Sequence, residues 1–123
     1  MTSTKIILTV DDSRTMRDML HMTLSEAGYR VIQAEDGVQG LKKLEAGRPD
    51  AIITDINMPR LDGLGFIEKV RSDPARRTIP ILVLTTESDA EPKERARRAG
   101  ATGWIVKPYN PVKLLDALHR VGA

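Results

Sequence analysis

The chain has 123 residues, of which 19 are Lys or Arg and 17 are Asp or Glu, and it contains no cysteine. That length suits one domain, and 41% hydrophobic with 29% charged residues is typical of a globular protein rather than a disordered segment. The lack of cysteine excludes disulfide frameworks, thiolate zinc sites and cysteine nucleophiles. A net charge of +2 does not favour a nucleic-acid partner. No apolar run reaches the roughly 18 residues of a membrane span, and residues 1–5 do not begin a signal peptide, so a cytoplasmic protein is expected.

Short apolar runs alternate with amphipathic segments from one end of the chain to the other. The runs predict strands at residues 6–10, 29–34, 51–54, 81–84 and 104–106. Apolar residues at helical spacing predict helices at residues 13–28, about 37–45 and 93–99, and from about residue 111. Another helix, after Asp62-Gly63, carries Leu64, Ile67 and Val70. The predicted apolar face of the first helix includes Met16, Met19, Leu20 and Leu24, and that of the last helix includes Val112, Leu115 and Leu118.

The alternation of strands and helices predicts a parallel sheet with helices on both faces, because parallel strands need crossover connections. The strands at 6–10, 51–54 and 81–84 are apolar almost throughout, as central strands must be. The strand at 29–34 is more polar and the strand at 104–106 is short, which places both at the edges. A doubly wound α/β fold with five strands in the order 2-1-3-4-5, already known from flavodoxin-like proteins, satisfies these constraints.

Chemically active side chains follow four of the five predicted strands. They are Asp11 and Asp12 after the first strand, Asp55 after the third, Thr85 and Thr86 at the end of the fourth, and Lys107 after the fifth. The carboxyl ends of parallel strands meet at one edge of a sheet, so these groups are expected to lie together. At about 5 Å and an effective dielectric constant of ~20, each pair of ionised carboxylates repels by roughly 3 kcal/mol. A hard divalent cation compensates this repulsion best, and Mg²⁺ is the leading candidate.

The same edge of the sheet carries what phosphoryl chemistry needs. A hydroxyl at Thr85 and an ammonium at Lys107 are groups that bind phosphoryl oxygens. A carboxylate that attacks phosphorus forms an acyl phosphate. Any one of these aspartates alone would more simply be a loop residue or a helix cap, but matched chemistry at four strand ends favours a functional site.

Four motifs, each at a strand end, carry a resemblance to a known family. They are Val10-Asp11-Asp12-Ser13, residues 54–59 (Thr-Asp-Ile-Asn-Met-Pro) with Asp62-Gly63, Leu84-Thr85-Thr86-Glu87, and residues 100–109 (Gly-Ala-Thr-Gly-Trp-Ile-Val-Lys-Pro-Tyr). In this order they resemble a response-regulator receiver domain, and the similarity runs from Lys5 to Val121. The chain looks most like the single-domain, chemotaxis CheY-type regulators, whose sheet has this strand order. The resemblance implies one receiver domain over residues 1–123 with no output domain.

The resemblance also implies roles for individual residues. Asp55 would accept a phosphoryl group from a phosphohistidine of a sensor kinase, and Thr85 and Lys107 would hold the phosphoryl oxygens. Mg²⁺ would bind Asp12, Asp55 and the backbone carbonyl of Asn57, with Asp11 acting mainly through water. The Lys107-Pro108 bond would be cis, which costs little before proline. The switch would pass from Thr85 to Trp104, which stands where the family usually has Tyr or Phe.

Residues beside the expected phosphorylation site bear on how long the acyl phosphate lasts. Asn57 and Glu87 resemble the pair that orients an attacking water in fast-dephosphorylating chemotaxis regulators, so we predict a lifetime of seconds rather than hours. Thr86 opposes this prediction, because its β-branched side chain could crowd the approach to phosphorus.

The implied output is a change in protein binding, since no DNA-binding or catalytic domain is present in the sequence. The first candidate partners are a chemotaxis histidine kinase and a flagellar motor switch protein, and the expected state is a monomer. The basic helix at residues 93–99 is equally compatible with a solvated face and an interaction surface. His21 and His119 are interpreted as surface residues.

Two other functions remain open, and two more are disfavoured. One is a phosphate sink for a chemotaxis kinase, and another is a single-domain receiver outside chemotaxis. A phosphatase with an aspartate nucleophile is disfavoured because such enzymes typically need a second carboxylate two residues later as general acid. Asp55 is followed by Ile56-Asn57 and Asp11 by Asp12-Ser13, so neither supplies it. A purely structural module would leave three clustered aspartates unexplained.

Overall fold

The computed structural model describes residues 4–123, so the part of the signal-peptide prediction that concerns residues 1–3 lies outside it. In the described part of the chain, five strands form a parallel sheet in the order β2-β1-β3-β4-β5, as predicted. Their bounds are β1 (Ile6–Val10), β2 (Arg30–Ala34), β3 (Ala51–Thr54), β4 (Ile81–Thr85) and β5 (Gly103–Val106).

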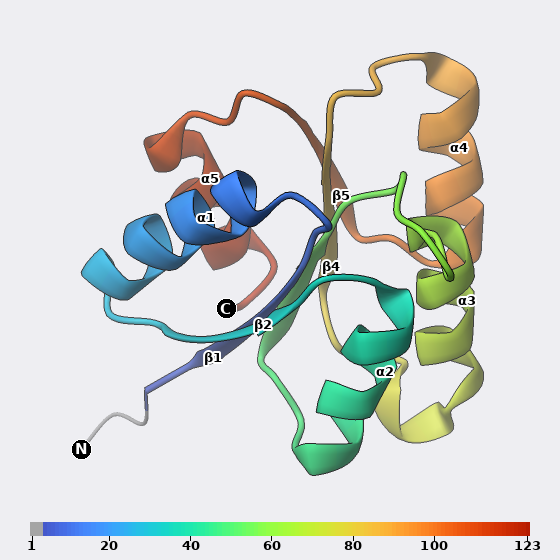
Figure 1. The fold of residues 1–123 in the computed structure, drawn as a ribbon, viewed down its shortest axis with the longest axis horizontal. Helices are drawn as coiled ribbons and strands as arrows, with labels where there is room; N and C mark the ends of the chain where they lie inside the picture. Colours follow the sequence, from blue (N-terminus) through green and yellow to red (C-terminus); the bar gives the residue numbers. More distant parts are fainter. Residues whose placement is uncertain (1–3) are drawn as a thin grey trace.

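Five α-helices cover the two faces of the sheet. They are α1 (Arg14–Glu26), α2 (Gly37–Ala46), α3 (Gly63–Ser72), α4 (Ala90–Ala99) and α5 (Pro111–Arg120), and a short 3₁₀-helix, η1 (Pro74–Arg76), precedes β4. Figure 1 shows α1 and α5 on one face and α2, α3 and α4 on the other. Four of the five described α-helices are preceded by a residue whose side chain accepts a hydrogen bond from the first turn, namely Ser13, Asp36, Asp62 and Asn110. None of the helices in residues 4–123 is long and apolar enough to cross a membrane.

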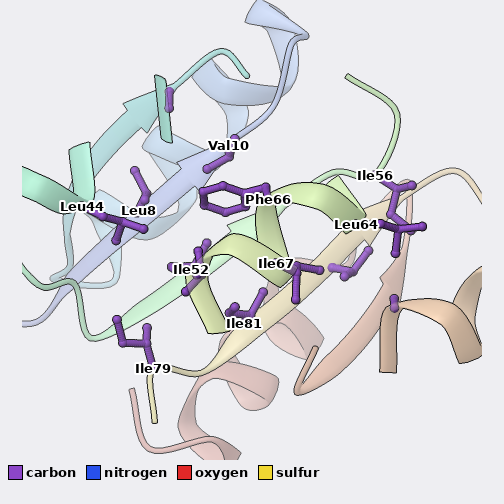
Figure 2. Close-up of a cluster of buried hydrophobic side chains, with 14 residues drawn as sticks. Leu8, Val10, Leu44, Ile52, Ile56, Leu64, Phe66, Ile67, Ile79 and Ile81 are labelled. Atoms are coloured by element: carbon purple, nitrogen blue, oxygen red, sulfur yellow. The ribbon is translucent and has the colours of Figure 1, made fainter. Parts of the chain in front are cut away.

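The sheet separates two groups of buried side chains. On the α2–α4 face, Phe66 is fully buried and lies among aliphatic side chains from β1, β3 and β4 (Figure 2). On the α1/α5 face, Leu20, Leu24, Leu114 and Leu118 pack against the opposite side of the same strands. Burial of a large apolar side chain contributes about 1.5–3 kcal/mol, so these two layers account for the main stabilisation of the fold.

Strand register brings distant parts of the sequence to one edge of the sheet. Val10 pairs with Thr54, and Thr85 pairs with Val106. The residues that follow these positions therefore leave the sheet side by side, which is the arrangement that the sequence predicts for its polar strand ends.

Some sequence predictions about the helices are wrong in detail. Helix α4 begins at Ala90 rather than Lys93. Pro92 lies in its first turn, where a proline is tolerated because its missing N–H needs no partner. In α5, Leu114 is fully buried whereas Val112 is 66% exposed, since Val112 lies in the first turn. Met19 lies outside the buried face of α1, with 48% of its surface exposed.

Candidate functional site

Three aspartates meet at the carboxyl edge of the sheet. Backbone hydrogen bonds extend the strand pairing to two of them: the Asp55 N–H donates to the Val10 carbonyl at 3.0 Å, and the Asp11 N–H donates to the Ala34 carbonyl at 3.1 Å. Asp11 is 2% exposed and Asp55 9% exposed, whereas Asp12 is open to solvent. Carboxylate oxygens of Asp11, Asp12 and Asp55 lie within 4.8 Å of one another.

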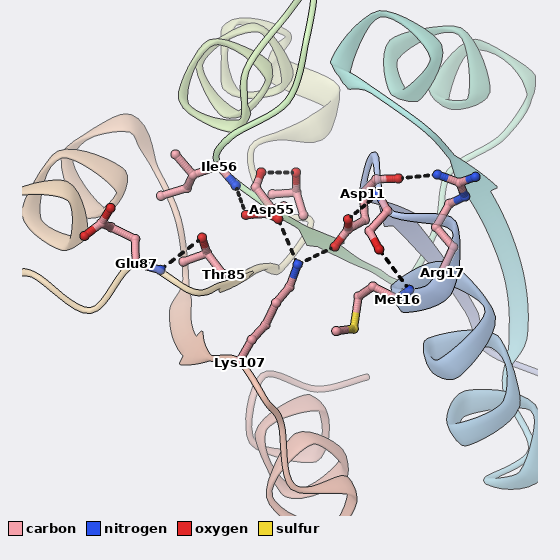
Figure 3. A network of polar contacts seen from close by, with 10 residues as sticks. Asp11, Met16, Arg17, Asp55, Ile56, Thr85, Glu87 and Lys107 are labelled. Atoms are coloured by element: carbon pink, nitrogen blue, oxygen red, sulfur yellow. Dashed lines mark hydrogen bonds and ion pairs between the residues drawn. The ribbon is translucent and has the colours of Figure 1, made fainter.

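Lys107 lies between two of these carboxylates. Its Nζ donates to Asp11 Oδ2 at 2.9 Å and to Asp55 Oδ2 at 2.8 Å (Figure 3). The Lys107 N–H also donates to the Thr85 carbonyl at 2.8 Å, which fixes the start of the loop after β5 beside the end of β4. One ammonium thus faces two largely buried carboxylates from a neighbouring part of the sheet.

Burial and the ion pairs set the protonation of these groups. Burial raises the pKa of Asp11 above its ordinary value, although the ammonium of Lys107 and the Ser13 N–H act in the opposite direction. Burial would lower the pKa of Lys107, but its hydrogen bonds to Asp11 and Asp55 outweigh this and raise that pKa. The lysine is therefore a fixed positive charge at neutral pH. Three carboxyl groups and one ammonium thus share the site.

Backbone N–H groups and one arginine orient the two buried carboxyl residues. The Ile56 N–H donates to Asp55 Oδ1 at 2.6 Å, and the Ser13 N–H donates to Asp11 Oδ1 at 2.9 Å. The guanidinium of Arg17 donates to the Asp11 carbonyl at 2.6 Å. The sequence does not predict this contact of Arg17, because a basic residue on a helix gives no signal of a contact with the preceding strand end.

Thr85 and its neighbours form another part of the site. Thr85 is fully buried, and its Oγ1 accepts a hydrogen bond from the Glu87 N–H at 3.4 Å (Figure 3). The adjacent Thr86 is exposed and Glu87 is half-buried. The segment that follows β4 therefore carries the hydroxyl of Thr86 and the carboxyl group of Glu87.

The remaining predicted residues lie around this centre. Asn57 is exposed on the loop that follows β3, two residues after Asp55. Trp104 is on β5 and packs against the buried cluster of the α2–α4 face, with its Nε1 buried and without a hydrogen-bond partner. The Lys107-Pro108 peptide bond is cis. His21 and His119, which the sequence predicts to be surface residues, are exposed.

The donor set fits a hard divalent cation. All three clustered side chains offer carboxylate oxygens, which Mg²⁺ and Ca²⁺ prefer, and no thiol is available to a softer metal. The exposed Asp12 leaves the cluster accessible from solvent on one side. The group could therefore hold a metal ion.

Comparison with known proteins decides the family. The family model "Response regulator receiver domain" matches residues 7–119. The chain belongs to the response regulator receiver family. Receiver domains are signalling modules of two-component systems, not classical enzymes, and the doubly wound fold with its 2-1-3-4-5 order agrees with this assignment.

Relatives of this receiver domain include chemotaxis proteins. The chain is 44% identical over 117 residues to chemotaxis protein CheY1 of Helicobacter pylori, with 94% of each chain covered. The structure of chemotaxis protein CheY4 of Vibrio cholerae has a TM-score of 0.92 and 45% identity, over 97% of this chain and 99% of that one. The receiver domain of sensor histidine kinase PA1611 from Pseudomonas aeruginosa has a TM-score of 0.90 and 30% identity, over 98% of this chain and all of that one. That structure contains a magnesium ion coordinated in its active-site cleft.

Proposed function

We propose that this receiver domain is a chemotaxis-type switch that accepts a phosphoryl group on Asp55. The proposal depends above all on the position of the Asp55 carboxylate. It is 9% exposed, and its two oxygens receive hydrogen bonds from the Ile56 N–H at 2.6 Å and from Lys107 Nζ at 2.8 Å. A carboxylate held in this way is an oriented nucleophile beside a fixed cation.

The phosphoryl transfer would proceed from a phosphohistidine of a kinase. A carboxylate oxygen of Asp55 forms the new bond to phosphorus as the bond from phosphorus to the histidine nitrogen breaks, which leaves an acyl phosphate and a histidine. Lys107 would move from its contact with the free carboxylate to a phosphoryl oxygen, and the Thr85 hydroxyl would donate to another. Water later attacks phosphorus, the bond from phosphorus to the Asp55 oxygen breaks, and inorganic phosphate leaves with the Asp55 carboxylate regenerated.

Mg²⁺ would be held by Asp12, Asp55 and the backbone carbonyl of Asn57, with Asp11 acting mainly through water. The oxygen-only cluster supports this assignment, as does the magnesium ion in the related receiver domain of PA1611. When bound, the cation neutralises charge on the transferring phosphoryl group. Lys107 and the cation together offset the negative charge that phosphorylation adds, about −1.5 to −2.

The output would be an altered affinity for a protein partner. Similarity to CheY1 and CheY4, both named chemotaxis proteins, favours a chemotaxis histidine kinase upstream and a flagellar motor switch protein downstream. We place the switch in Thr85 and Trp104, because Thr85 ends β4 at the site and Trp104 lies on the adjoining strand β5. Phosphorylation would favour one of two states of this pair and so change the surface around α4, β5 and α5.

Phosphotransfer from a radiolabelled chemotaxis kinase tests the acceptor. Label is expected on the wild type in the presence of Mg²⁺ and not on Asp55→Asn. Asp18→Asn, a substitution of an exposed aspartate on α1, is the matched control and retains labelling. Equal labelling of Asp55→Asn and the wild type would contradict the proposal.

Binding of a motor switch protein tests the output. The protein is titrated against the receiver domain with Mg²⁺, with and without beryllofluoride as a mimic of phospho-Asp55. Binding that tightens with the mimic and does not tighten in Asp55→Asn supports a motor-signalling regulator. Equal and negligible binding in both states would instead favour a phosphate sink.

A further inference from the structure

An ion pair ties the loop after the phosphorylation strand to the start of a different helix. The guanidinium of Arg60, in the loop at residues 56–62, pairs with Oδ2 of Asp36. Asp36 is 1% exposed, and its other oxygen accepts the Gln39 N–H at 2.9 Å, which caps α2. The Gln39 N–H and the guanidinium of Arg60 lower the pKa of Asp36 despite its burial, so the pair is ionised at neutral pH.

The loop bends sharply at Arg60. Arg60 has φ 66°, the only positive φ of a non-glycine residue in the described part of the chain. Across it, the Leu61 N–H donates to the Pro59 carbonyl at 2.7 Å, so three residues close a tight turn. A side chain at positive φ is unfavourable and persists where surrounding contacts hold it.

Further contacts fix the two ends of this loop. The Gly63 N–H donates to the Ile56 carbonyl at 2.7 Å, which closes the loop at its base. The Gly37 N–H donates to the Leu61 carbonyl at 3.3 Å, and a β-carbon at position 37 would lie 2.7 Å from that carbonyl oxygen. The loop therefore lies directly against the first turn of α2, and the Arg60–Asp36 pair joins the same two segments.

We propose that Arg60 is a positioning residue for the metal site. Its ion pair with Asp36 holds the loop at residues 56–62, and so holds the backbone carbonyl of Asn57 in place. This inference rests on the proposed function, in which the Asn57 carbonyl is a ligand of Mg²⁺. Loss of the Arg60–Asp36 ion pair allows the turn at Arg60 to relax, and the backbone carbonyl of Asn57 is then no longer held in position to bind the metal. Partners outside the ligand shell commonly change metal affinity about 10-fold or more when they are removed.

Two single substitutions separate positioning from simple charge. Asp36→Asn keeps a side-chain oxygen to cap α2 but removes the negative charge, whereas Arg60→Gly removes a positive charge and accepts positive φ without strain. Charge alone predicts opposite effects, because Mg²⁺ binds more tightly when a cation is removed and more weakly when an anion is removed. Positioning predicts that both substitutions weaken Mg²⁺ binding.

Calorimetric titration with Mg²⁺ measures this directly. We expect about 10-fold weaker binding for each variant, and no further loss in the double variant because the two residues act as one unit. Arg60→Lys restores part of the affinity. The matched controls are Asp73→Asn and Arg76→Asn, which break a second aspartate–arginine pair at η1, before the amino end of β4, and leave Mg²⁺ affinity unchanged.

Amide hydrogen exchange provides a second measurement that needs no metal. The Leu61 N–H is expected to exchange faster in Arg60→Gly and Asp36→Asn than in the wild type. Unchanged or oppositely shifted Mg²⁺ affinities in folded variants would overturn the positioning role and leave the proposed function intact. Absence of Mg²⁺ binding by the wild type would overturn the metal site itself, and the positioning role with it.

Discussion

Gly63 lies directly against the backbone of Asp55: a β-carbon at position 63 would be 2.1 Å from the Asp55 carbonyl oxygen. No side chain fits there unless the end of β3 moves. Gly63→Ala is therefore expected to lower the free energy of unfolding by about 2 kcal/mol, the usual range for overpacking. Urea denaturation measures the change.

Gly47→Ala is the matched control for this substitution. Gly47 has nothing within 4 Å of its β-carbon position and an extended backbone at φ 171°. Its replacement should change stability by less than about 1 kcal/mol. A Gly63→Ala variant as stable as Gly47→Ala would show that the end of β3 yields easily.

Thr9 and Thr54 are both fully buried in central strands, but only one hydroxyl has a partner. Thr54 Oγ1 lies 2.9 Å from the Asp55 carbonyl and donates to it, whereas Thr9 Oγ1 has no partner. Thr9→Val should therefore raise the free energy of unfolding by about 1 kcal/mol, and Thr54→Val should lower it by a similar amount. Equal effects in thermal denaturation would contradict this account.

Asp36 should make stability depend on pH in the acid range. Its pKa is lower in the folded chain than its ordinary value of 3.8, through the Gln39 N–H and Arg60. The ionised form therefore stabilises the fold above the unfolded-state pKa, and this stabilisation is lost as pH falls through the lowered folded-state pKa. Asp36→Asn should be less stable than the wild type at neutral pH, with a difference that narrows below about pH 4.

Denaturation of both proteins from pH 2 to 7 measures that difference. Asp18→Asn, on the exposed surface of α1, is the control and should show little change across the range. A constant gap between Asp36→Asn and the wild type down to the lowest pH would exclude titration of Asp36 as its cause.

The lifetime of the acyl phosphate should be seconds. Asn57 is exposed two residues after Asp55, and Glu87 is half-buried two residues after Thr85; we propose that both orient the attacking water. Thr86 is exposed next to Glu87, and Thr86→Ala should shorten the lifetime by opening the approach to phosphorus. Decay of label from phosphorylated protein in Mg²⁺ measures this, and a wild-type half-life above an hour would contradict the prediction.

Trp104 should report phosphorylation through its fluorescence. It is the only tryptophan, and its indole Nε1 is buried without a partner, so a rearrangement of β5 would change its surroundings. Beryllofluoride with Mg²⁺ should change the emission in the wild type and in Thr85→Ser, which keeps the hydroxyl. The change should be absent in Asp55→Asn and reduced in Thr85→Ala. A full response in Asp55→Asn would exclude coupling to the site.

The sequence predicted the fold well because its signals are local. Apolar runs that end in Asp11, Asp55 or Lys107 identify both a strand and its chemistry, and parallel pairing then brings these ends together. Boundaries were less predictable: Pro92 obscured the start of α4, and η1 has too short a pattern to detect. Helix faces were also misjudged where an apolar residue lies in a first turn, as at Val112.

Contacts between loops lay beyond sequence reasoning. Asp36 and Arg60 are 24 positions apart in segments without periodicity, and no local pattern pairs them. The requirement for glycine at position 63 likewise arises from the carbonyl of Asp55. The Asp62-Gly63 motif is visible in the sequence, but its physical cause is the close approach of Gly63 to the backbone of Asp55 in the folded chain.

The pairing of Lys107 with Asp11 spans 96 positions of the chain, and it has a consequence for synthesis. A chain emerging from the ribosome carries all three aspartates long before it carries the lysine. Until β5 docks beside β4, the ammonium of Lys107 is not between Asp11 and Asp55, and a proton or a cation from solution must offset their repulsion. A divalent cation bound by these carboxylates would offset their repulsion in the partly made protein until Lys107 takes up its place.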